Sequence, residues 1–420
     1  MRRTWSILLC VALLICMMPS VFAEGEKVIT VATWDVTTTA YLTVTKDAFE
    51  ASHPGVKIEY IDLASQDYNQ KVSTMLAGGD SVDVVHVKEL SDAANWSEQG
   101  YILGLDDKIA ETGYDLSHYA GMSECYIDNE GKQVALPYRA DYWVLFYNKA
   151  LFDAAGLEYP TNDLTWDQYA ELAEKITSGT EGQDKVYGTH YHTWLSAVAN
   201  WAVCDGVNTL ADGEYSDLAY FYNLVLDLED KGAAMSFPDL KASGLHYKGA
   251  FEAGNVAMLP MGYWFVAQLI ADKASGVFDF DFGFVSVPHL EGVAAGSSFG
   301  SPTGASINAA SDDPDLAWEY ISWLCSEEGA KAFASCGARP AFINDAVAEV
   351  MAGADGFPSD EASKAALQPV AVSLEWPTGE KVSAIKTIVN EEHTNIMTRE
   401  YTVDEGIAAM NERVAEVLAD

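Results

Sequence analysis

Several aromatic residues stand beside charged residues in this chain, at points where predicted strands end. Trp34 and Asp35 follow the first strand-like run, and Trp264 follows Gly262 and Tyr263 after an apolar run. An aromatic ring offers a rigid apolar surface at low entropic cost, and a carboxylate accepts strong hydrogen bonds from hydroxyl groups. Together they suit a ligand that has an apolar face and a rim of hydroxyl groups, as a sugar ring has.

The other candidate binding residues follow later strand ends or lie in loops. They are His86, Lys88, Glu89, Arg139, Asp141, His192, Trp194, Tyr263 and Trp376. The sequence leaves structural alternatives open for several of them. Trp34 and Trp376 could pack against the core, Arg139 and Asp141 could form an ion pair, and His86, Lys88 and Glu89 could lie in solvated loops.

The candidate residues do not form a recognisable catalytic or metal-binding motif. The sequence contains neither H-E-x-x-H nor a glycine-rich phosphate loop. His190 and His192 form a His-x-His pattern without an evident third ligand, so we expect no metal and no cofactor. Among 63 acidic residues a carboxylate pair can always be found, so a glycosidase reading has no specific support. We expect a binding protein and not an enzyme, with a secreted glycoside hydrolase as the enzymatic alternative.

Alternating strands and helices would position the first group of these residues. Residues 27–35, 56–63 and 82–87 are predicted strands, and helices are predicted after a polar loop at 35–39 and over 66–76. This order predicts a parallel α/β sheet with right-handed crossovers, which binds ligands beyond the carboxyl ends of its strands.

The later part of the chain continues the α/β pattern. Thr165 and Gln168 have the spacing of a capping box, and helices are predicted over 194–201, 216–231 and 314–326. Residues 136–156 read as a strand that opens with a polar bend and ends in a Tyr-Asn-Lys turn. Such a segment is typical of a crossover between two domains. A chain of 420 residues is long enough to form two hydrophobic cores, so we expect two domains.

Five stretches resemble, in the same order, passages of the extracellular solute-binding proteins of ABC transporters, in the maltose-binding-protein-like sugar-binding family. They are residues 27–35, 76–87, 136–157, 251–265 and 298–333. The resemblance implies a two-lobed periplasmic-binding-protein fold, in which each lobe is a sheet flanked by helices and hinge crossovers join discontinuous lobes. It places the first lobe at 24–140 plus 304–347 and the second at 141–303 plus 348–420.

The resemblance also implies a function and roles for several residues. Such a protein is a monomer that binds a carbohydrate, here expected to be an oligosaccharide, and delivers it to permease subunits. The family has a stacking tryptophan at the position of Trp264, another near Trp376 and a carboxylate at Asp141. Its loop matching 190–194 carries an acid, which histidines replace here. A polyamine or other cation, held by aromatic rings with Asp35, Glu89 and Asp141, is the alternative ligand.

The N-terminus and the charge indicate an exported protein. Residues 1–23 carry two arginines, an apolar run and Ala23, as a cleavable signal peptide does. We expect the periplasm or the cell surface, without a lipid anchor at Cys16, because the bulky Ile15 precedes it. A net charge of −39 argues against binding to nucleic acid or to anionic membranes.

Four cysteines lie beyond the signal peptide. The sequence leaves two alternatives open for them, a Cys325–Cys336 disulfide and free thiols.

Overall fold

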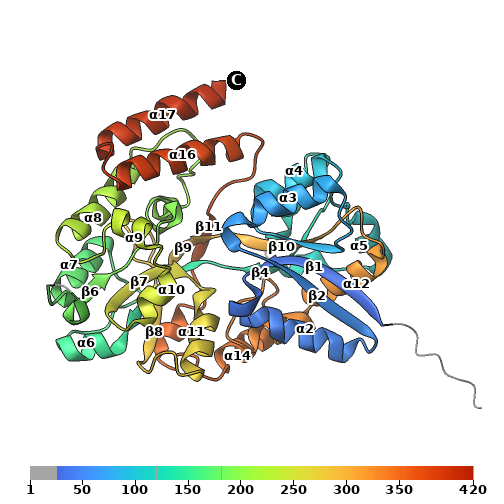
Figure 1. The fold of residues 1–420 in the computed structure, drawn as a ribbon, viewed down its shortest axis with the longest axis horizontal. Helices are drawn as coiled ribbons and strands as arrows, with labels where there is room; N and C mark the ends of the chain where they lie inside the picture. The colour runs from blue at the N-terminus through green and yellow to red at the C-terminus, as the bar shows by residue number, and fades with distance from the viewer. Residues whose placement is uncertain (1–25, 120, 181, 420) are drawn as a thin grey trace, which may run out of the picture.

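The structure is a computed structural model, and it describes residues 26–119, 121–180 and 182–419 (Figure 1). The predicted signal peptide, residues 1–23, and Cys16 lie outside the described residues. The chain forms two lobes that lie side by side, each built on a β-sheet flanked by helices, as predicted. Within the described residues, no helix is both long enough and apolar enough to cross a membrane.

The sheet of the first lobe has five strands in the order β2-β1-β3-β10-β4. The strands are β1 (Lys27–Trp34), β2 (Val56–Leu63), β3 (Val84–Val87), β4 (Leu136–Ala140) and β10 (Pro302–Ile307). The first three are parallel, but β10 runs antiparallel to both β3 and β4. The parallel arrangement predicted for the first three strands is confirmed. The prediction did not include β4, which leads into an interlobe crossing, or β10, which follows one and runs against both of its neighbours.

Helices flank this sheet. They are α2 (Ala40–Ser52), α3 (Tyr68–Gly78), α4 (Leu90–Glu98), α5 (Asp106–Thr112), α12 (Pro314–Leu324) and α13 (Glu327–Ala334). The helix predicted over 314–326 ends at Leu324, and a new one begins after Ser326. The Ser326 hydroxyl caps α13 by accepting a hydrogen bond from Gly329 N at 3.3 Å.

The sheet of the second lobe has four strands in the order β6-β7-β5-β8. They are β5 (Trp143–Asn148), β6 (Tyr187–Thr189), β7 (Val256–Gly262) and β8 (Phe282–Ser286). All residues of β5 are buried, which explains its continuous apolar run. Around it lie α6 (Lys149–Ala155), α7 (Trp166–Ile176), α8 (Leu218–Asp230), α9 (Phe237–Ser243), α10 (Tyr247–Glu252), α11 (Phe265–Ala274), α15 (Glu361–Ala365), α16 (Val382–Met397) and α17 (Val403–Ala419). Helix α14 (Asp345–Ala352) instead packs on α13 of the first lobe.

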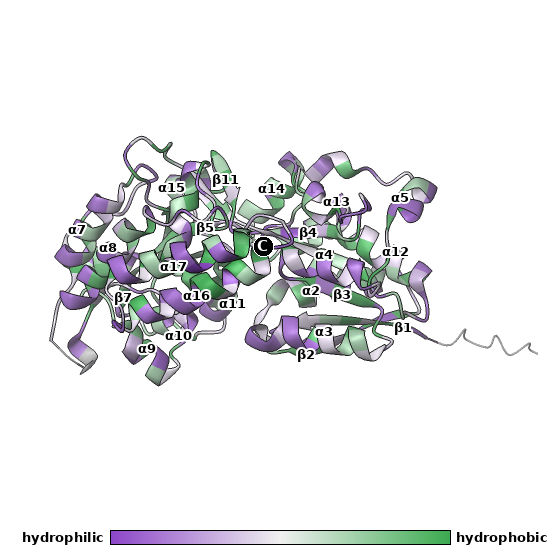
Figure 2. Cartoon of the chain, turned by 90° about the horizontal axis from the view of Figure 1, so that it is seen from above, coloured by the Kyte–Doolittle hydropathy of each residue, from purple (hydrophilic) through white to green (hydrophobic). Residues whose placement is uncertain are grey.

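Helix α7 illustrates how the sequence specifies these outer helices. Its buried residues Trp166, Tyr169, Ala173 and Ile176 recur at helical spacing, so that one face meets the core. The predicted capping box at Thr165 begins the helix, with Gln168 N donating to Thr165 Oγ1 at 3.3 Å. Figure 2 shows hydrophilic and hydrophobic residues alternating along α7 and α8, as expected for helices with one solvated face.

The chain crosses between the lobes at the predicted segment. Strands β4 and β5 lie in different sheets, although only Asp141 and Tyr142 separate them. A second crossing joins β9 (Ser297–Gly300), which pairs with β11 (Ala371–Leu374), to β10. Because β10 starts at Pro302, the first-lobe sheet resumes two residues before the predicted boundary at 304.

Two further expectations differ from the structure. Residues 194–201, predicted as a helix, form short 3₁₀ segments at Leu195–Ala197 and Ala199–Asp205 that are interrupted at Val198, whose φ is −135°. The thiols of Cys125, Cys204, Cys325 and Cys336 are all free, so the structure contains no Cys325–Cys336 disulfide. Cys325 is buried and lies 3.7 Å from the carbonyl oxygen of Leu136, to which its thiol donates.

Candidate ligand site

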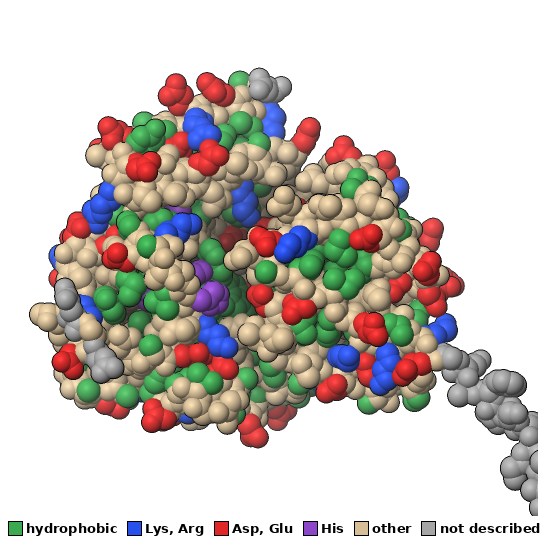
Figure 3. Space-filling view, viewed as in Figure 1, with side chains coloured by type: hydrophobic (Ala, Val, Ile, Leu, Met, Phe, Trp, Pro, Cys, Tyr) green, Lys and Arg blue, Asp and Glu red, His purple; other side chains and the backbone are tan. Residues whose placement is uncertain are grey.

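A hollow lies between the two lobes. Figure 3 shows it with histidine side chains on the side of the second lobe and hydrophobic side chains further inside. The carboxyl ends of β1 and β3 lead into its first-lobe side, where Asp35 and Lys88 follow the strands. Burial lowers the pKa of His246 of the second lobe, and the nearby carboxylate of Asp35 opposes this effect. The two lobes therefore present polar groups to each other across the hollow.

Trp34 forms the base of the first-lobe side. Its side chain is mostly buried, and its ring packs edge-on against Tyr68 with 4.8 Å between ring centroids. Two cationic side chains face the ring, Lys88 with its Nζ 5.5 Å from the centroid and Arg139 with its Cζ 5.6 Å away. The ring thus supports both basic side chains of this lobe that were predicted to bind ligand.

Arg139 and Asp141 form an ion pair at the first crossing. The Nε of Arg139 lies 2.7 Å from Oδ2 of Asp141, and both side chains are largely buried. Arg139 also donates to the hydroxyl of Tyr41 at 2.8 Å and to that of Thr303 at 3.0 Å. Burial raises the pKa of Asp141 in spite of the nearby guanidinium groups of Arg139 and Arg339. The pair joins β4 to the first residue of the crossing that follows it, and it is the ion pair that the sequence left open as the structural alternative.

The polar residues in the last part of β3 and directly after it take three different positions. His86 is fully buried in the first lobe, where its Nδ1 lies 2.9 Å from the hydroxyl of Thr33, and burial lowers its pKa to about 3. Lys88 donates to the carbonyl oxygen and the hydroxyl of Ser65 at 2.8 and 2.7 Å, and burial lowers its pKa. Glu89 pairs with Lys386 of α16 at 2.7 Å. The structure brings Lys88 to the hollow, Glu89 to its edge and His86 into the core.

An aromatic wall forms the second-lobe side, and we define it by His192, Trp194, His246, Tyr247 and Trp264. The ring centroids of His192 and Trp194 are 4.4 Å apart, and those of Trp194 and Tyr247 are 5.6 Å apart. Trp264 lies 6.4 Å from Trp194 and donates from Nε1 to the hydroxyl of Tyr247 at 3.1 Å. Trp194 is exposed over 37% of its surface, so the wall presents a free ring.

The position of Trp264 depends on the glycine two residues before it. A Cβ atom at Gly262 would lie 1.8 Å from the indole ring of Trp264, so only glycine lets the ring fold back over the end of β7. The ring also meets Trp143 of β5 edge-on, at 5.8 Å between centroids. The predicted Gly262–Trp264 turn therefore holds a ring against the second-lobe sheet.

Sequence reasoning missed two residues of the wall, His246 and Tyr247. They begin α10, where His246 Nδ1 accepts a hydrogen bond from Lys248 N at 3.4 Å. The available signal was a His-Tyr pair that stands three residues before the stretch at 251–265. Burial lowers the pKa of His192 to about 3, so its imidazole is neutral at physiological pH and offers one donor and one acceptor.

Two predicted aromatic residues lie away from the wall. Tyr263 is fully buried and stacks on Tyr142 at 5.3 Å, beside the first crossing. Trp376 is also buried, with Nζ of Lys386 5.8 Å from its ring centroid. The structure thus places both residues where the lobes join or meet.

Residues 296–300 form a G-x-S-x-G pattern, which in some hydrolases carries a nucleophilic serine. Here the serine has a structural role. Ser298 lies on β9, where its hydroxyl donates to the carbonyl oxygen of Trp143 at 2.7 Å and accepts from Trp143 N at 3.0 Å. A nucleophile elbow instead turns from a strand into a helix. Among the described residues, no three histidine, cysteine or acidic side chains converge as metal ligands.

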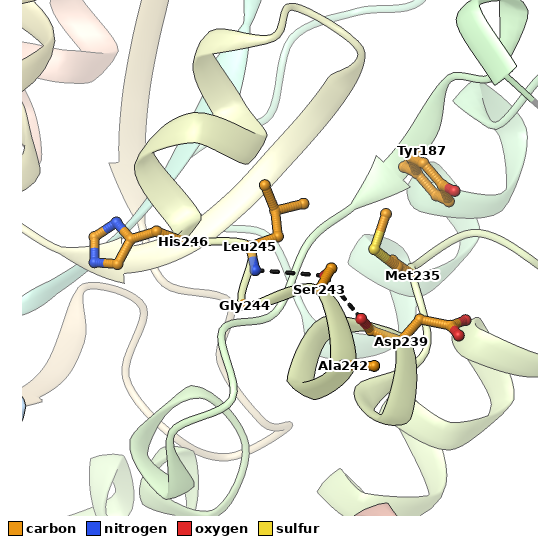
Figure 4. Close-up of a pocket in the computed structure, with 8 residues that line it drawn as sticks. All are labelled: Tyr187, Met235, Asp239, Ala242, Ser243, Gly244, Leu245 and His246. Atoms are coloured by element: carbon orange, nitrogen blue, oxygen red, sulfur yellow. Dashed lines mark hydrogen bonds between the residues drawn. The ribbon is translucent and has the colours of Figure 1, made fainter.

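A second hollow, of about 730 Å³, lies on the second lobe beside α9 (Figure 4). Its lining includes Tyr187, Met235 and Asp239, and it reaches His246 at one end. Figure 4 shows the imidazole of His246 pointing away from Tyr187 and Met235. His246 belongs to both the second hollow and the aromatic wall. Its ring points away from Tyr187 and Met235, so these two lining residues lie apart from the wall.

Known proteins share this architecture and part of this sequence. Residues 34–331 match the family model of the bacterial extracellular solute-binding proteins. A sugar transporter from Rhizobium etli, solved in an open conformation, is 39% identical, with 92% of this chain and 99% of that chain covered and a TM-score of 0.77. A mannitol-binding protein of Pseudomonas aeruginosa is 24% identical over 86% of this chain and 81% of its own length.

A structure with lower sequence identity has the same fold over nearly the whole chain. The ABC substrate-binding protein of Listeria monocytogenes in complex with cycloalternan is 22% identical, with a TM-score of 0.77 over 94% of this chain and all of that chain. The family model spans both predicted interlobe crossings. The chain belongs to the family of bacterial extracellular solute-binding proteins.

Proposed function

We propose that this chain is the extracytoplasmic substrate-binding component of an ABC importer and that it binds a carbohydrate, an oligosaccharide, between its lobes. The aromatic wall carries the proposal. Trp194 and Trp264 offer rings for the C–H faces of sugar units, with Asp35 on the opposite side of the hollow. The names of the relatives support a sugar or polyol ligand, since they include a sugar transporter and a mannitol-binding protein.

The polar groups at the hollow suit a ligand without net charge. The carboxylate of Asp141 faces Arg139, that of Glu89 faces Lys386, and Lys88 is held by Ser65. A polyamine needs carboxylates that are free to pair with it, and two of the three acids predicted for that role already have basic partners. A neutral imidazole at His192 can instead donate to one hydroxyl and accept from another. These contacts favour a hydroxyl-rich neutral solute over a cation.

We further propose that binding works by closure of the lobes. A ligand that contacts Asp35 on one side and the aromatic wall on the other interacts fully only when the lobes approach each other. It therefore shifts the equilibrium toward the closed arrangement by its higher affinity for that arrangement. The closed monomer would then deliver the ligand to the permease subunits. The lobes would be 24–140 plus 304–347 and 141–303 plus 348–420, with the short segments around Asp141 and Gly300 as hinges.

The test is a thermal-shift screen of residues 24–420 against oligosaccharides, monosaccharides, polyols and polyamines. A ligand that binds only the native state raises the melting temperature by an amount set by its concentration over Kd. We expect a rise with one class of glycan, and chromatography of the incubated glycan should show no product. A rise with polyamines alone would replace the carbohydrate with a cation, and accumulation of a shorter glycan would replace the binding protein with a hydrolase.

A further inference from the structure

One ion pair joins helices of opposite lobes. Glu89 precedes α4 of the first lobe, and Lys386 lies on α16, which packs on α8 and α17 of the second. Their Oε2 and Nζ atoms are 2.7 Å apart, although 297 residues separate them in the sequence. Every other ion pair among the described residues lies within one lobe or at a crossing. The pair therefore connects the lobes independently of the hinge.

The surroundings of the pair are part of the same contact. Glu89 and Lys386 are exposed over about a third of their side chains, so solvent screens them less than a fully exposed pair. Lys386 also lies over the ring of Trp376, with Nζ 5.8 Å from the centroid. The pair itself lines a hollow of about 600 Å³, together with Asn69 of α3, Asp92 of α4 and Asn390 of α16.

The nearby acids leave Glu89 as the main partner of Lys386. Burial raises the pKa of both Asp92 and Glu375 to about 7, so each is only partly ionised at neutral pH. The carboxylate of Glu89 instead lies at hydrogen-bonding distance from the ammonium group. A charge-assisted hydrogen bond of this kind is stronger than one between neutral groups.

We propose that Glu89 and Lys386 form a clasp that holds the lobes together before ligand binds, and so sets how much of the ligand-free protein is closed. Neither side chain belongs to the aromatic wall, and the carboxylate of Glu89, at the edge of the hollow, is already paired with Lys386. The clasp therefore changes affinity through the lobe equilibrium. Ligand affinity scales with the fraction of protein in the competent arrangement. Weakening the clasp should therefore weaken binding of every ligand by the same factor.

The experiment compares Lys386→Met with a matched control, Lys364→Met, whose partner Glu361 lies on the same helix, 3.2 Å away. Small-angle X-ray scattering of ligand-free protein measures the radius of gyration. We expect a larger radius for Lys386→Met and no change for Lys364→Met. Sodium chloride at 1 M should enlarge wild type toward the radius of Lys386→Met and leave that variant unchanged, because salt screens the same pair.

A charge exchange completes the test. The double variant Glu89→Lys with Lys386→Glu keeps one pair of opposite charges and should return the radius toward that of wild type. Once a ligand is known, Lys386→Met should weaken its affinity by about two- to ten-fold, in the range of exposed to partly buried pairs. If Lys386→Met scatters like the control, or if the charge exchange scatters like Lys386→Met, the clasp is wrong. The scattering measurement needs no ligand, so a wrong carbohydrate assignment would not affect it.

Discussion

Trp194 exposes more than a third of its surface within a wall of packed rings, a position that costs hydrophobic free energy unless a ligand covers it. Its neighbours His192 and Tyr247 hold it edge-on, so the ring is preorganised and loses little entropy on binding. Trp34, by contrast, is mostly buried and supports two basic side chains. Both tryptophans were candidates of the same kind, and their surroundings give them different roles.

At the residue scale, we predict that Trp194→Ala weakens ligand affinity about 10- to 100-fold, since stacking and burial of one aromatic face contribute about 1.5–3 kcal/mol. Isothermal titration calorimetry with the glycan from the screen measures the change. The matched control is Tyr220→Ala, because Tyr220 has the same 37% exposure but lies on α8 and donates to Asp167. Equal losses for the two variants would mean that the aromatic wall is not the binding surface.

At the element scale, two crossings between the lobes are packed directly against each other. Gly300, at the end of β9, approaches the peptide carbonyl of Asp141 so closely that a Cβ atom would lie 2.0 Å from that oxygen. Ser298 of the same strand bonds to both backbone groups of Trp143. The second crossing is thus held against the first by backbone contacts, which no periodicity within either segment specifies.

We predict that Gly300→Ala lowers the free energy of unfolding by about 1–3 kcal/mol, because the backbone must move to admit one methyl group. Urea denaturation followed by tryptophan fluorescence measures this change. The control is Gly249→Ala in α10, where the atom nearest to a new Cβ is 3.9 Å away and alanine favours the helix. A loss of stability no larger than that of the control would show that the crossings can separate at no cost.

At the scale of the whole molecule, buried histidines in both lobes link stability to pH. Burial lowers the pKa of His86, His192 and His393 to about 3 and that of His190 to about 4. The unfolded chain, with histidine pKa values near 6.5, then binds more protons than the folded chain between about pH 4 and 6.5. These histidines make stability highest above about pH 6.5 and reduce it as the pH falls. Acids whose pKa burial raises to about 7, such as Glu229, act in the opposite direction.

A single substitution isolates one of these contributions. We predict that His393→Gln makes the slope of unfolding free energy against pH shallower by about 1.4 kcal/mol per pH unit between pH 4 and 6, which corresponds to one proton. His393 lies on α16, where its Nδ1 meets the hydroxyl of Tyr222 at 3.2 Å. Urea titrations at several pH values give the slope, and His118→Gln at a half-exposed position is the control. Identical slopes for wild type and His393→Gln would mean that His393 titrates normally in the folded protein.

The sequence by itself determined what short-range physics controls. Strand and helix periodicity gave the order of elements, the Thr165–Gln168 capping box gave the start of α7, and the Gly262–Trp264 turn pointed to a ring of the wall. The segment at 136–156 was identified as a crossover because its polar bend and apolar strand are adjacent in the chain. These features depend on residues within about one turn or one strand of each other.

Only the tertiary structure decided which distant residues meet. It paired Glu89 with Lys386, buried His86 of β3 in the first lobe, added His246 and Tyr247 to the wall, and made β10 an antiparallel neighbour of β3. The physical reason is that the residue types around a position in the sequence are the same whether its side chain contacts solvent or a residue hundreds of positions away. Burial and ion pairing depend on contacts between the lobes and within their cores, and the folded chain creates those contacts.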